Sequence, residues 1–442
     1  MSSTSFLGID WGTHSSKSAW YRSNLNRYDP HLPIFPSDLR KIDETIIFAA
    51  ERETHAQDLI RSIKGVLIMD PLGTPFWSNE SRGDTGTSLG EAVAFSLTAL
   101  LNDAISSSSS DEDFEIGFSF PNWLAADDRK AQAAAQNFRE AVAVAAEVVA
   151  QYSFDELPQP TKPFSISRWR EIVSTSRPRI DAGRQFDLQT IMSVRNVTSN
   201  GRLRWGFISE SGAAGLPYLR AMEIEDVPGA HGLAKLLVVD VGAGSTDIGY
   251  MLRVQHRETN KANLYYFAPA PSLPVAGNVL TRELLNFLRA KNQRITEIEA
   301  ELRKMQETGW HELAFVQNWI SQIAQHVREY VEGIPDERWL PLPVTLNVVV
   351  TGGSGLVPGL KKAVTDAVRQ GLQSRIKEKK VLEKIQTPGE HLPKLSFGTE
   401  PEYARRAVCL GASDADRPSC KFMSNMEAPG PQFKIAGAPK WT

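Results

Sequence analysis

Cysteine is scarce in this chain, and long apolar runs are absent. The 442 residues include two cysteines, Cys409 and Cys420, which argues against a disulfide framework and favours a reducing compartment. No apolar run approaches the roughly 20 residues that a membrane-spanning helix needs. The first five residues are polar and lead straight into a predicted strand, so we expect no signal peptide and a cytoplasmic location.

An excess of basic charge and metal-ligand motifs are also lacking. The formal net charge of -3 gives no reason to expect nucleic acid or an anionic membrane as the main partner. The 8 histidines are scattered, and neither HxxxH nor CxxC occurs, which argues against a zinc site. With 41% hydrophobic and 23% charged residues the composition is that of a globular protein, and the length predicts two domains or lobes.

Two glycine-rich aspartate turns are the strongest signal that is present. The first is FLGIDWGTHSSKSAW (Phe6 to Trp20) and the second is LLVVDVGAGSTDIGYM (Leu236 to Met251). Each is an apolar strand that ends in Asp, followed by a Gly/Ser/Thr turn and a second strand. A third glycine turn, in NVVVTGGSGLVPGLKKAV (Asn347 to Val364), follows an apolar strand and opens a helix. This layout predicts an α/β protein that holds a nucleotide between two similar halves.

The residues of these turns suit a phosphate and a metal ion. Glycine lets the backbone approach a ligand, consecutive N–H groups form an anion nest, and Thr and Ser add hydroxyl donors. Asp10 and Asp240 end their strands and would hold hydrated Mg²⁺ beside a triphosphate if the halves face each other. Asp247, on the returning strand, would orient an attacking water or bind the water shell of the metal. The predicted phosphate-binding residues are Gly12, Thr13, His14, Ser15, Gly242, Ala243, Gly244, Ser245 and Thr246.

The alternative is that both turns are simply tight hairpins in an α/β protein. A single turn of this kind is weak evidence, because the pattern also occurs by chance. Two in order, each flanked by apolar strands, favour a duplicated nucleotide-binding unit, although the identity between the halves is confined to the turns.

The remaining pattern predicts the other elements. We expect further strands over 44–49, 114–120, 264–268 and 344–351, and helices over 89–101, 125–150, 281–331 (broken near Gly309), 360–375 and 403–410. Asp127 and Asp128 would complement the helix dipole in the first turn of the helix over 125–150. Residues 154–203 lack sustained periodicity and are interpreted as an exposed insertion with short strands, in which Trp169 and several arginines form a solvated excursion or a partner surface. We expect the tail after Ser413 to be extended or disordered.

These motifs resemble those of the actin-like ATPase superfamily, and within it the nucleotide-binding domain of the DnaK-type heat-shock chaperones. GIDWGTHSS resembles the first phosphate loop of that family, VVDVGAGSTDIG the second, and VVVTGGSGLVPGLKKAV its adenosine motif. ISESGAAGLPYL resembles the helix that links the lobes, PEYARRAVCLGAS the closing helix, and RSIKGVLI the segment of the catalytic lysine. The resemblance implies a two-lobed α/β fold, duplicated and actin-like or ribonuclease H-like, with a central nucleotide cleft.

The same resemblance implies domain boundaries. Lobe I would comprise residues 1–230 plus 400–413, with the insertion at 154–203. Lobe II would comprise residues 231–399, with a helical subdomain at 281–335, and residues 414–442 would form a tail.

The resemblance also implies roles for further residues, with ATP or ADP and Mg²⁺ as cofactors. Lys64 would stabilise the charge that develops on the transferred phosphoryl group, and Glu210 with Asp247 would place the water or the metal shell. Without the resemblance, Lys64 would be a surface lysine and Glu210 an exposed acid at a helix start. Gly352, Gly353 and Ser354 would approach the ribose and adenine, and Gly277 is a further predicted nucleotide-binding residue.

Four functions compete for this sequence. The first is an ATP-dependent switch with slow hydrolysis, whose lobe closure controls a protein partner. The second is a filament-forming actin-like protein. The third is a metabolite kinase, because GIDWGTHSSKSAW, including Lys17, also resembles the opening of sugar kinases, and the fourth is an ATPase that no longer turns over. We rank the switch first; residues 414–442 are too few for the peptide-binding domain of the chaperones, so we expect no client-folding cycle.

Overall fold

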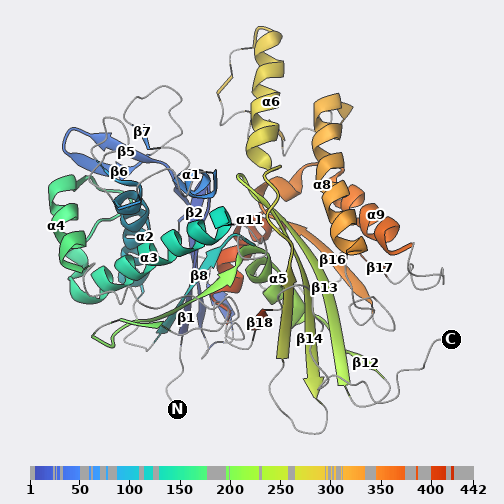
Figure 1. The fold of residues 1–442 in the computed structure, drawn as a ribbon, viewed down its shortest axis with the longest axis horizontal. Coiled ribbons are helices and arrows are strands. Elements are labelled where there is room, and N and C mark those ends of the chain that lie inside the picture. Colours follow the sequence, from blue (N-terminus) through green and yellow to red (C-terminus); the bar gives the residue numbers. More distant parts are fainter. Residues whose placement is uncertain are drawn as a thin grey trace.

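The computed structural model is a mixed α/β protein with three sheets, in which parallel and antiparallel pairings are combined (Figure 1). Two seven-stranded sheets form its centre, and a four-stranded sheet lies beside the first. None of the helices in the described part of the chain is both long and apolar enough to cross a membrane. The structure describes residues 5–22, 25, 27–29, 33–49, 59–60, 63–69, 76–77, 87–108, 114–122, 129–176, 196–198, 200–227, 231–256, 264–293, 295–296, 300, 303–304, 310, 312–333, 345–373, 385–386, 400–414 and 420–422.

The first large sheet is built around a tight hairpin. Strands β1 (Ser5–Trp11) and β2 (Ser15–Arg22) are antiparallel, and their register places Asp10 opposite Lys17. On the other side of β1 lies β8 (Phe114–Phe120), which is parallel to it, and β11 (Arg204–Ser209) is parallel to β8. The other strands of this sheet are β3 (Arg27–Asp29), β4 (Phe35–Pro36) and β10 (Asn196–Val197).

The second large sheet is built around a longer hairpin. Strands β13 (His231–Val241) and β14 (Thr246–His256) are antiparallel, and their register places Asp240 opposite Asp247. Strand β16 is parallel to β13, and β17 is parallel to β16. The other strands are β12 (Glu225–Val227), β15 (Leu264–Pro269), β16 (Leu346–Thr351), β17 (Ile385–Gln386) and β18 (Cys420–Phe422).

The central strands of the two sheets repeat one topology. The order is β11-β8-β1-β2-β3 in the first sheet and β17-β16-β13-β14-β15 in the second, with the same parallel and antiparallel pairings at each step. The two glycine turns join β1 to β2 and β13 to β14, so they occupy equivalent positions. The likeness between the halves therefore extends well beyond the turns to which the sequence identity is confined.

Two long helices pack together beside the first sheet. Helix α2 (Leu89–Ser106) begins with a capping box in which the side chains of Ser88 and Glu91 accept each other's backbone N–H groups. The predicted helix over 125–150 is α3 (Arg129–Gln151), which starts four residues later and has no acid in its first turn. Asp127 and Asp128 lie outside the described part of the chain, so their predicted role at the helix dipole stays a prediction.

Residues 154–203 contain short strands, as predicted, at Phe164–Ser165 and Asn196–Val197. The interpretation of this segment as an exposed insertion is wrong for residues 166–176. Residues Ile166–Ser176 form helix α4, whose apolar positions recur at helical spacing among charged ones. Trp169 is 1% exposed, packs edge-on against Phe95 and donates a hydrogen bond to the carbonyl of Glu91 at 2.9 Å. It belongs to the core and not to a partner surface. The four-stranded sheet beside it contains β5 (Leu39–Ile42), the predicted strand β6 (Thr45–Phe48), β7 (Leu59–Ile60) and β9 (Phe164–Ser165).

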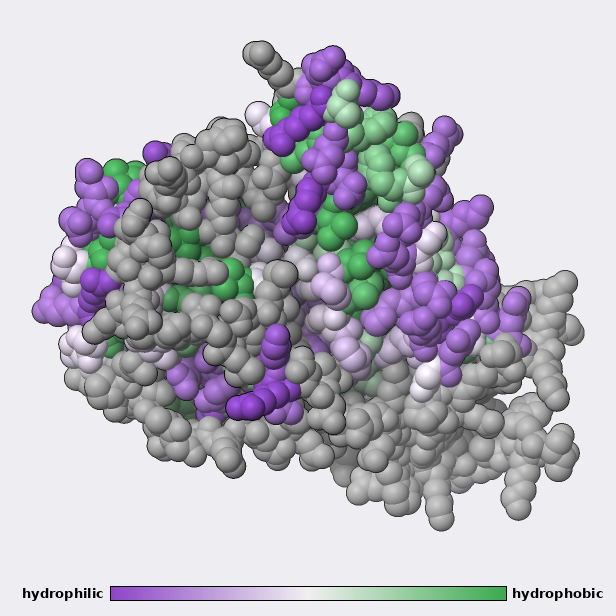
Figure 2. Space-filling view, turned by 45° about the horizontal axis from the view of Figure 1, so that its top comes forward, coloured by the Kyte–Doolittle hydropathy of each residue, from purple (hydrophilic) through white to green (hydrophobic). Residues whose placement is uncertain are grey.

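In the described part of the stretch predicted to be helical over 281–331, the structure has helices α6 (Gly277–Ala290) and α8 (Ala314–Glu332), and Ala300, Arg303 and Lys304 between them are also helical. The first ends early because Asn292 adopts a left-handed backbone conformation with φ of 57°. Helix α8 packs with α9 (Leu360–Gln373) against the second sheet, whereas α6 projects from the top of the molecule (Figure 1). Hydrophilic side chains cover much of this projecting end in the space-filling view, with apolar ones gathered beside them (Figure 2).

Two further helices, α5 (Glu210–Ala221) and α11 (Glu400–Ala412), lie between the large sheets (Figure 1). They share a buried apolar cluster with β13, β14 and β15. Glycine permits the close approach of α11 to β1 and to α5. A Cβ at Gly8 in β1 would overlap the backbone of α11, and a Cβ at Gly411 would overlap the carbonyl oxygen of Ala213 in α5. Pro217 has no N–H, so the carbonyl of Ala213 accepts no hydrogen bond from position 217 within α5. Helix α11 therefore contacts α5 at a carbonyl that lacks its usual partner in the helix.

The tail after Ser413 is not wholly extended away from the fold. Strand β18 pairs in parallel with β15, through Tyr265 with Cys420 and Phe267 with Phe422. The tail is predicted to be extended or disordered, and these three residues are extended, because the edge of the second sheet offers them backbone hydrogen bonds. Residues 423–442 lie outside the described part of the chain.

Candidate functional site

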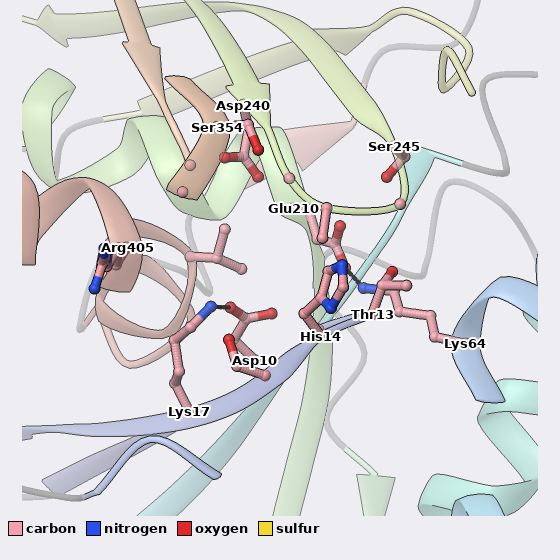
Figure 3. A pocket seen from close by; sticks show the side chains of 18 of the residues that line it. Asp10, Thr13, His14, Lys17, Lys64, Glu210, Asp240, Ser245, Ser354 and Arg405 are labelled. Carbon is pink, nitrogen blue, oxygen red and sulfur yellow. Dashed lines mark hydrogen bonds and ion pairs between the residues drawn. The ribbon is translucent and has the colours of Figure 1, made fainter. Parts of the chain in front are cut away.

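A cleft of about 260 Å³ lies where the two glycine turns approach each other (Figure 3). It brings together residues from both hairpins, the turn after β16, helix α1 (Ile63–Met69), and helices α5 and α11. Fifteen of the predicted site residues line it: Asp10, Gly12, Thr13, His14, Ser15, Lys64, Glu210, Asp240, Gly242, Ala243, Gly244, Ser245, Gly352, Gly353 and Ser354.

Three predicted residues lie behind the wall of the cleft. Thr246 is fully buried, and its hydroxyl donates a hydrogen bond to the carbonyl of Val275 at 2.7 Å. Asp247 is 1% exposed and is held within a hydrogen-bond network. A Cβ at Gly277 would overlap the hydroxyl of Ser354 and would lie 2.9 Å from the ammonium of Lys304, so Gly277 marks a point where segments converge beside the cleft.

Five lining residues were not assigned to the predicted nucleotide site: Lys17, Ile34, Ala404, Arg405 and Val408. In the sequence, Lys17 stands out only because its segment, GIDWGTHSSKSAW, resembles the opening of sugar kinases. Its position follows from the hairpin register, because a residue opposite Asp10 on the neighbouring strand shares its face of the sheet. The other four depend on contacts distant in the sequence, for which local periodicity carries no signal.

Asp10 and Asp240 lie on opposite sides of the cleft, at equivalent positions of the two hairpins (Figure 3). Each is 5% exposed. Asp10 accepts hydrogen bonds from the ammonium of Lys17 at 3.2 Å and from the hydroxyl of Ser119 at 3.4 Å. Asp240 is less satisfied, because its Oδ1 is buried and has no hydrogen-bond partner within the described residues.

The pKa of Asp240 is raised well above its ordinary value by burial, and the carboxylates of Glu210, Asp247 and Asp10 raise it further. The pKa of Lys17 is also raised, but by attraction to acids and not by burial. Burial alone would lower the pKa of Lys17, but the attraction of Asp10 and the hydrogen bond to it outweigh burial, so this pKa is raised and the ammonium stays charged. The acids of the cleft therefore disfavour ionisation of Asp240, and the ammonium of Lys17 opposes this effect in part.

Lys64 and Glu210 form a buried ion pair at the cleft, with side chains 4% and 8% exposed. Lys64 comes from α1. Glu210 begins α5, where the preceding Ser209 caps the helix by accepting the N–H of Gly212 at 3.2 Å. Burial raises the pKa of Glu210 to about 7, while Lys64 opposes the rise and Asp247 adds to it. The interpretations of Lys64 as a surface lysine and of Glu210 as an exposed acid are therefore wrong.

The carboxylate of Asp247 accepts three hydrogen bonds. They come from the Ser245 hydroxyl at 2.7 Å, the Ser272 hydroxyl at 2.5 Å and the backbone N–H of Asn122 at 3.0 Å. Asn122 follows β8 of the first sheet, so this contact links the two sheets. Because most of its acceptor capacity is used, Asp247 positions Ser245 and the base of the cleft.

The third glycine turn lies directly against Asp240. Gly352 has a φ of 82°, a conformation that other residues rarely adopt. A Cβ there would lie 2.5 Å from Asp240 Oδ1 and 2.5 Å from the carbonyl oxygen of Val241. Glycine is therefore required at this position by conformation and by space, and Gly353 and Ser354 follow it along the cleft wall.

These donors suit Mg²⁺ bound beside a phosphate more than a metal caged by protein. No group of three or more His, Cys, Asp or Glu side chains suitable for a metal occurs among the residues that the structure describes. Mg²⁺ usually takes one or two carboxylates and completes its octahedron with phosphate oxygens and waters. The unpartnered Oδ1 of Asp240 and the carboxylate of Asp10 fit that requirement.

Comparison with known proteins adds no assignment: no family model matches the chain, and no curated protein is significantly similar to it.

Proposed function

We propose that this protein is a Mg²⁺-dependent, slowly hydrolysing ATPase of actin-like fold that acts as a nucleotide-dependent switch for a protein partner. The repeated order of the central strands supports a duplicated, two-lobed fold, with one sheet in each lobe. In such a fold the nucleotide binds between the lobes, where the two equivalent turns meet. The lobes would correspond to residues 1–230 plus 400–413 and to residues 231–399.

One observation carries this proposal. Asp10 and Asp240 stand at equivalent positions of the repeated hairpins and line one cleft together with both glycine turns. A pair of ordinary hairpins does not require buried acids to converge, and burying them disfavours their ionised forms. An ion bound between Asp10 and Asp240, next to a phosphate, compensates for that cost.

The chain's own residues would divide the work. Bound Mg²⁺ supplies neutralisation of phosphate charge, and the residues that would hold it through water are Asp10 and Asp240. The ammonium of Lys64 stabilises charge on the transferred phosphoryl group. Glu210, with a pKa raised to about 7, orients the attacking water and accepts its proton. Gly352, Gly353 and Ser354 would receive the adenosine.

The same arrangement supports a switch. Helices α5 and α11 each contribute residues to the cleft and pack between the two sheets. A ligand between the lobes favours the closed form because it binds that form more tightly than the open form. Closure would shift these helices together and alter the outer surface that a protein partner recognises.

A metabolite kinase is the second candidate, because Lys17 lines the cleft beside Asp10. A phosphate acceptor at that end would use Lys17 as its anchor. No contact within the described residues favours a filament over the switch. Screening sugars and polyols for ATP-dependent phosphorylation separates the kinase from the ATPase, and a robust hit would displace the switch.

The test of the proposed function combines binding and turnover. Calorimetry should show ATP binding that requires Mg²⁺, and phosphate release should fall strongly in Asp10→Ala, Asp240→Ala and Lys64→Ala. Asp366→Ala, an acid on the outer surface of α9 with a side chain 44% exposed, is the matched control and should leave both unchanged. No heat with ATP and Mg²⁺, or full turnover in all three site variants, refutes the assignment.

A further inference from the structure

Among the described residues, two contacts beside the glycine turns join the halves of the cleft, and neither has a place in the proposed chemistry. The imidazole of His14, in the first glycine turn, is hydrogen-bonded through Nε2 to the side-chain oxygen of Asn278, at the start of α6. The side chain of Thr13 occupies the space that a Cβ at Gly244 would need. The first turn therefore touches both the second turn and the helix that projects beyond it.

Asn278 is rigidly connected to the second turn. Its backbone N–H bonds to the carbonyl of Ala243 at 2.8 Å, and the N–H of the preceding Gly277 bonds to the carbonyl of Gly242 at 3.0 Å. The N-terminus of α6 is thus fixed to the turn that would hold phosphate. A displacement of this turn must move Asn278, and with it the first turns of α6.

His14 is fixed to the other half. Its carbonyl accepts the N–H of Ser37 at 2.9 Å, and it lies in the tight connection between β1 and β2. The side-chain bond between His14 and Asn278 consequently spans two bodies, each held by backbone hydrogen bonds of its own. Breaking this bond does not require either turn to unfold.

The base of the cleft is joined differently. There Asn122 bonds through its N–H to Asp247, through its amide nitrogen to the carbonyl of Ile248 at 2.9 Å, and through its amide oxygen to the hydroxyl of Ser211 at 3.0 Å. All these groups are buried, and α5 and α11 pack beside them. Within the described residues, several buried hydrogen bonds join the halves at the base of the cleft, and the bond between His14 and Asn278 joins them beside the turns. We interpret the base as a hinge and the bond beside the turns as a latch.

We propose that the hydrogen bond between His14 and Asn278 is a latch that holds the cleft closed, and that a nucleotide enters or leaves only when it opens. The identity of the ligand as a nucleotide rests on the proposed function. The latch itself rests on the contact between His14 and Asn278. A triphosphate between the turns must separate Thr13 from Gly244, and the bond between His14 and Asn278 restrains that separation. The latch also passes the motion to α6.

The strength of the hydrogen bond between His14 and Asn278 sets how far its loss should shift the population of the open form. A side-chain hydrogen bond between partly buried groups makes a modest net contribution, so its loss raises the open population about 2- to 10-fold. Release of bound nucleotide should accelerate by a similar factor, because release requires the open form.

The decisive experiment measures opening without nucleotide. Spin labels at Gln132→Cys on α3 and Glu283→Cys on α6, both exposed positions, report the distance between the halves in a Cys420→Ser background; Cys409 is buried. Four variants are compared in the full chain: His14→Ala, Asn278→Ala, the double variant, and Asn286→Ala as a control at an exposed asparagine of α6.

The latch predicts a longer-distance population in either single variant and no further increase in the double variant, because the two side chains act through one bond. Asn286→Ala should match the parent protein. Unchanged distances in all variants, or additive effects of His14→Ala and Asn278→Ala, would overturn the latch.

A second measurement follows the release of a fluorescent ADP after mixing with excess ATP and Mg²⁺. Asn278→Ala should accelerate release about 2- to 10-fold, and an unchanged rate would overturn the role of the latch in nucleotide exchange. If the parent protein binds no nucleotide, the proposed function fails while the distance measurement still decides whether the latch exists.

Discussion

Lys64 and Glu210, 146 residues apart in the sequence, form an ion pair that is almost completely removed from water. They come from different elements, α1 and α5, and meet at the cleft between the two sheets. Burial costs both charges their hydration, so each depends on the other. This pair therefore contributes to stability as well as to the proposed chemistry, and variants must separate the two.

Lys64→Met alone should destabilise the protein by about 3–5 kcal/mol, because it leaves Glu210 buried without its partner. The double variant Lys64→Met/Glu210→Gln should recover most of that loss while ATP hydrolysis stays at background. Denaturant unfolding and phosphate release measure the two effects. Recovery of hydrolysis in the double variant would show that the pair serves structure alone.

Asp240→Asn should make the ligand-free protein more stable and the proposed site weaker. The substitution keeps the shape of the side chain and removes a carboxylate whose pKa burial raises, next to three other acids. Thermal unfolding should therefore occur at a higher temperature without ligand, and the added stabilisation by ATP with Mg²⁺ should disappear. A lower unfolding temperature without ligand, combined with normal Mg²⁺ dependence, contradicts the role of Asp240.

Gly411→Ala should disrupt the packing of α11 on α5. The added methyl group would overlap the carbonyl oxygen of Ala213, and backbone cannot move aside as a flexible side chain does. We expect a loss of roughly 3 kcal/mol, at the upper end for overpacked sites. Gly353→Ala is the control, since nothing lies within 4 Å of its added carbon. Equal unfolding free energies for the two variants would refute the close packing of these helices.

The stability of the ligand-free protein should depend on pH through Glu210. Its pKa is raised from 4.5 to about 7 in the folded state, mainly by burial, so the folded protein binds more protons than the unfolded chain between these values. The free energy of unfolding therefore falls as pH rises from about 4.5 to about 7, by at most about 3 kcal/mol from this group.

Glu210→Gln should flatten that part of the pH profile, and Glu332→Gln, at an exposed position of α8, should not. Asp240 contributes a change of the same sign, so part of the slope persists in Glu210→Gln. Chemical denaturation at several pH values provides the measurement. Identical slopes for the parent protein and Glu210→Gln would contradict the raised pKa.

Local pattern predicted the elements well where the signal is strong. The strand at Phe114–Phe120 was predicted to the residue, because alternating apolar positions end at a proline. The helix α2 was predicted from its first residue, Leu89. Helix α4 was missed although its buried apolar positions recur at helical spacing, because the segment is only 11 residues long and its other positions are arginine, glutamate, serine and threonine.

Some residues of the candidate site could likewise be predicted from the sequence, and others could not. Residues within the two turns follow from the sequence, since a strand, an aspartate and a glycine turn are contiguous there. Lys17, Arg405 and the bond between His14 and Asn278 depend on pairing and on contacts across hundreds of residues. Asp247 belongs to the motif by sequence, yet its three hydrogen-bond donors, one of them from the other sheet, assign it to positioning.

The sequence by itself determined that two hairpins of one design occur in this chain, because backbone turns and strand alternation are encoded by neighbouring residues. Only the tertiary structure decided that their aspartates line one cleft, that Lys64 reaches Glu210, and that α5 and α11 pass between the sheets. Burial, and with it the raised pKa values of Asp240 and Glu210 and the buried ion pair of Lys64 with Glu210, is a property of segments packed together from distant parts of the chain.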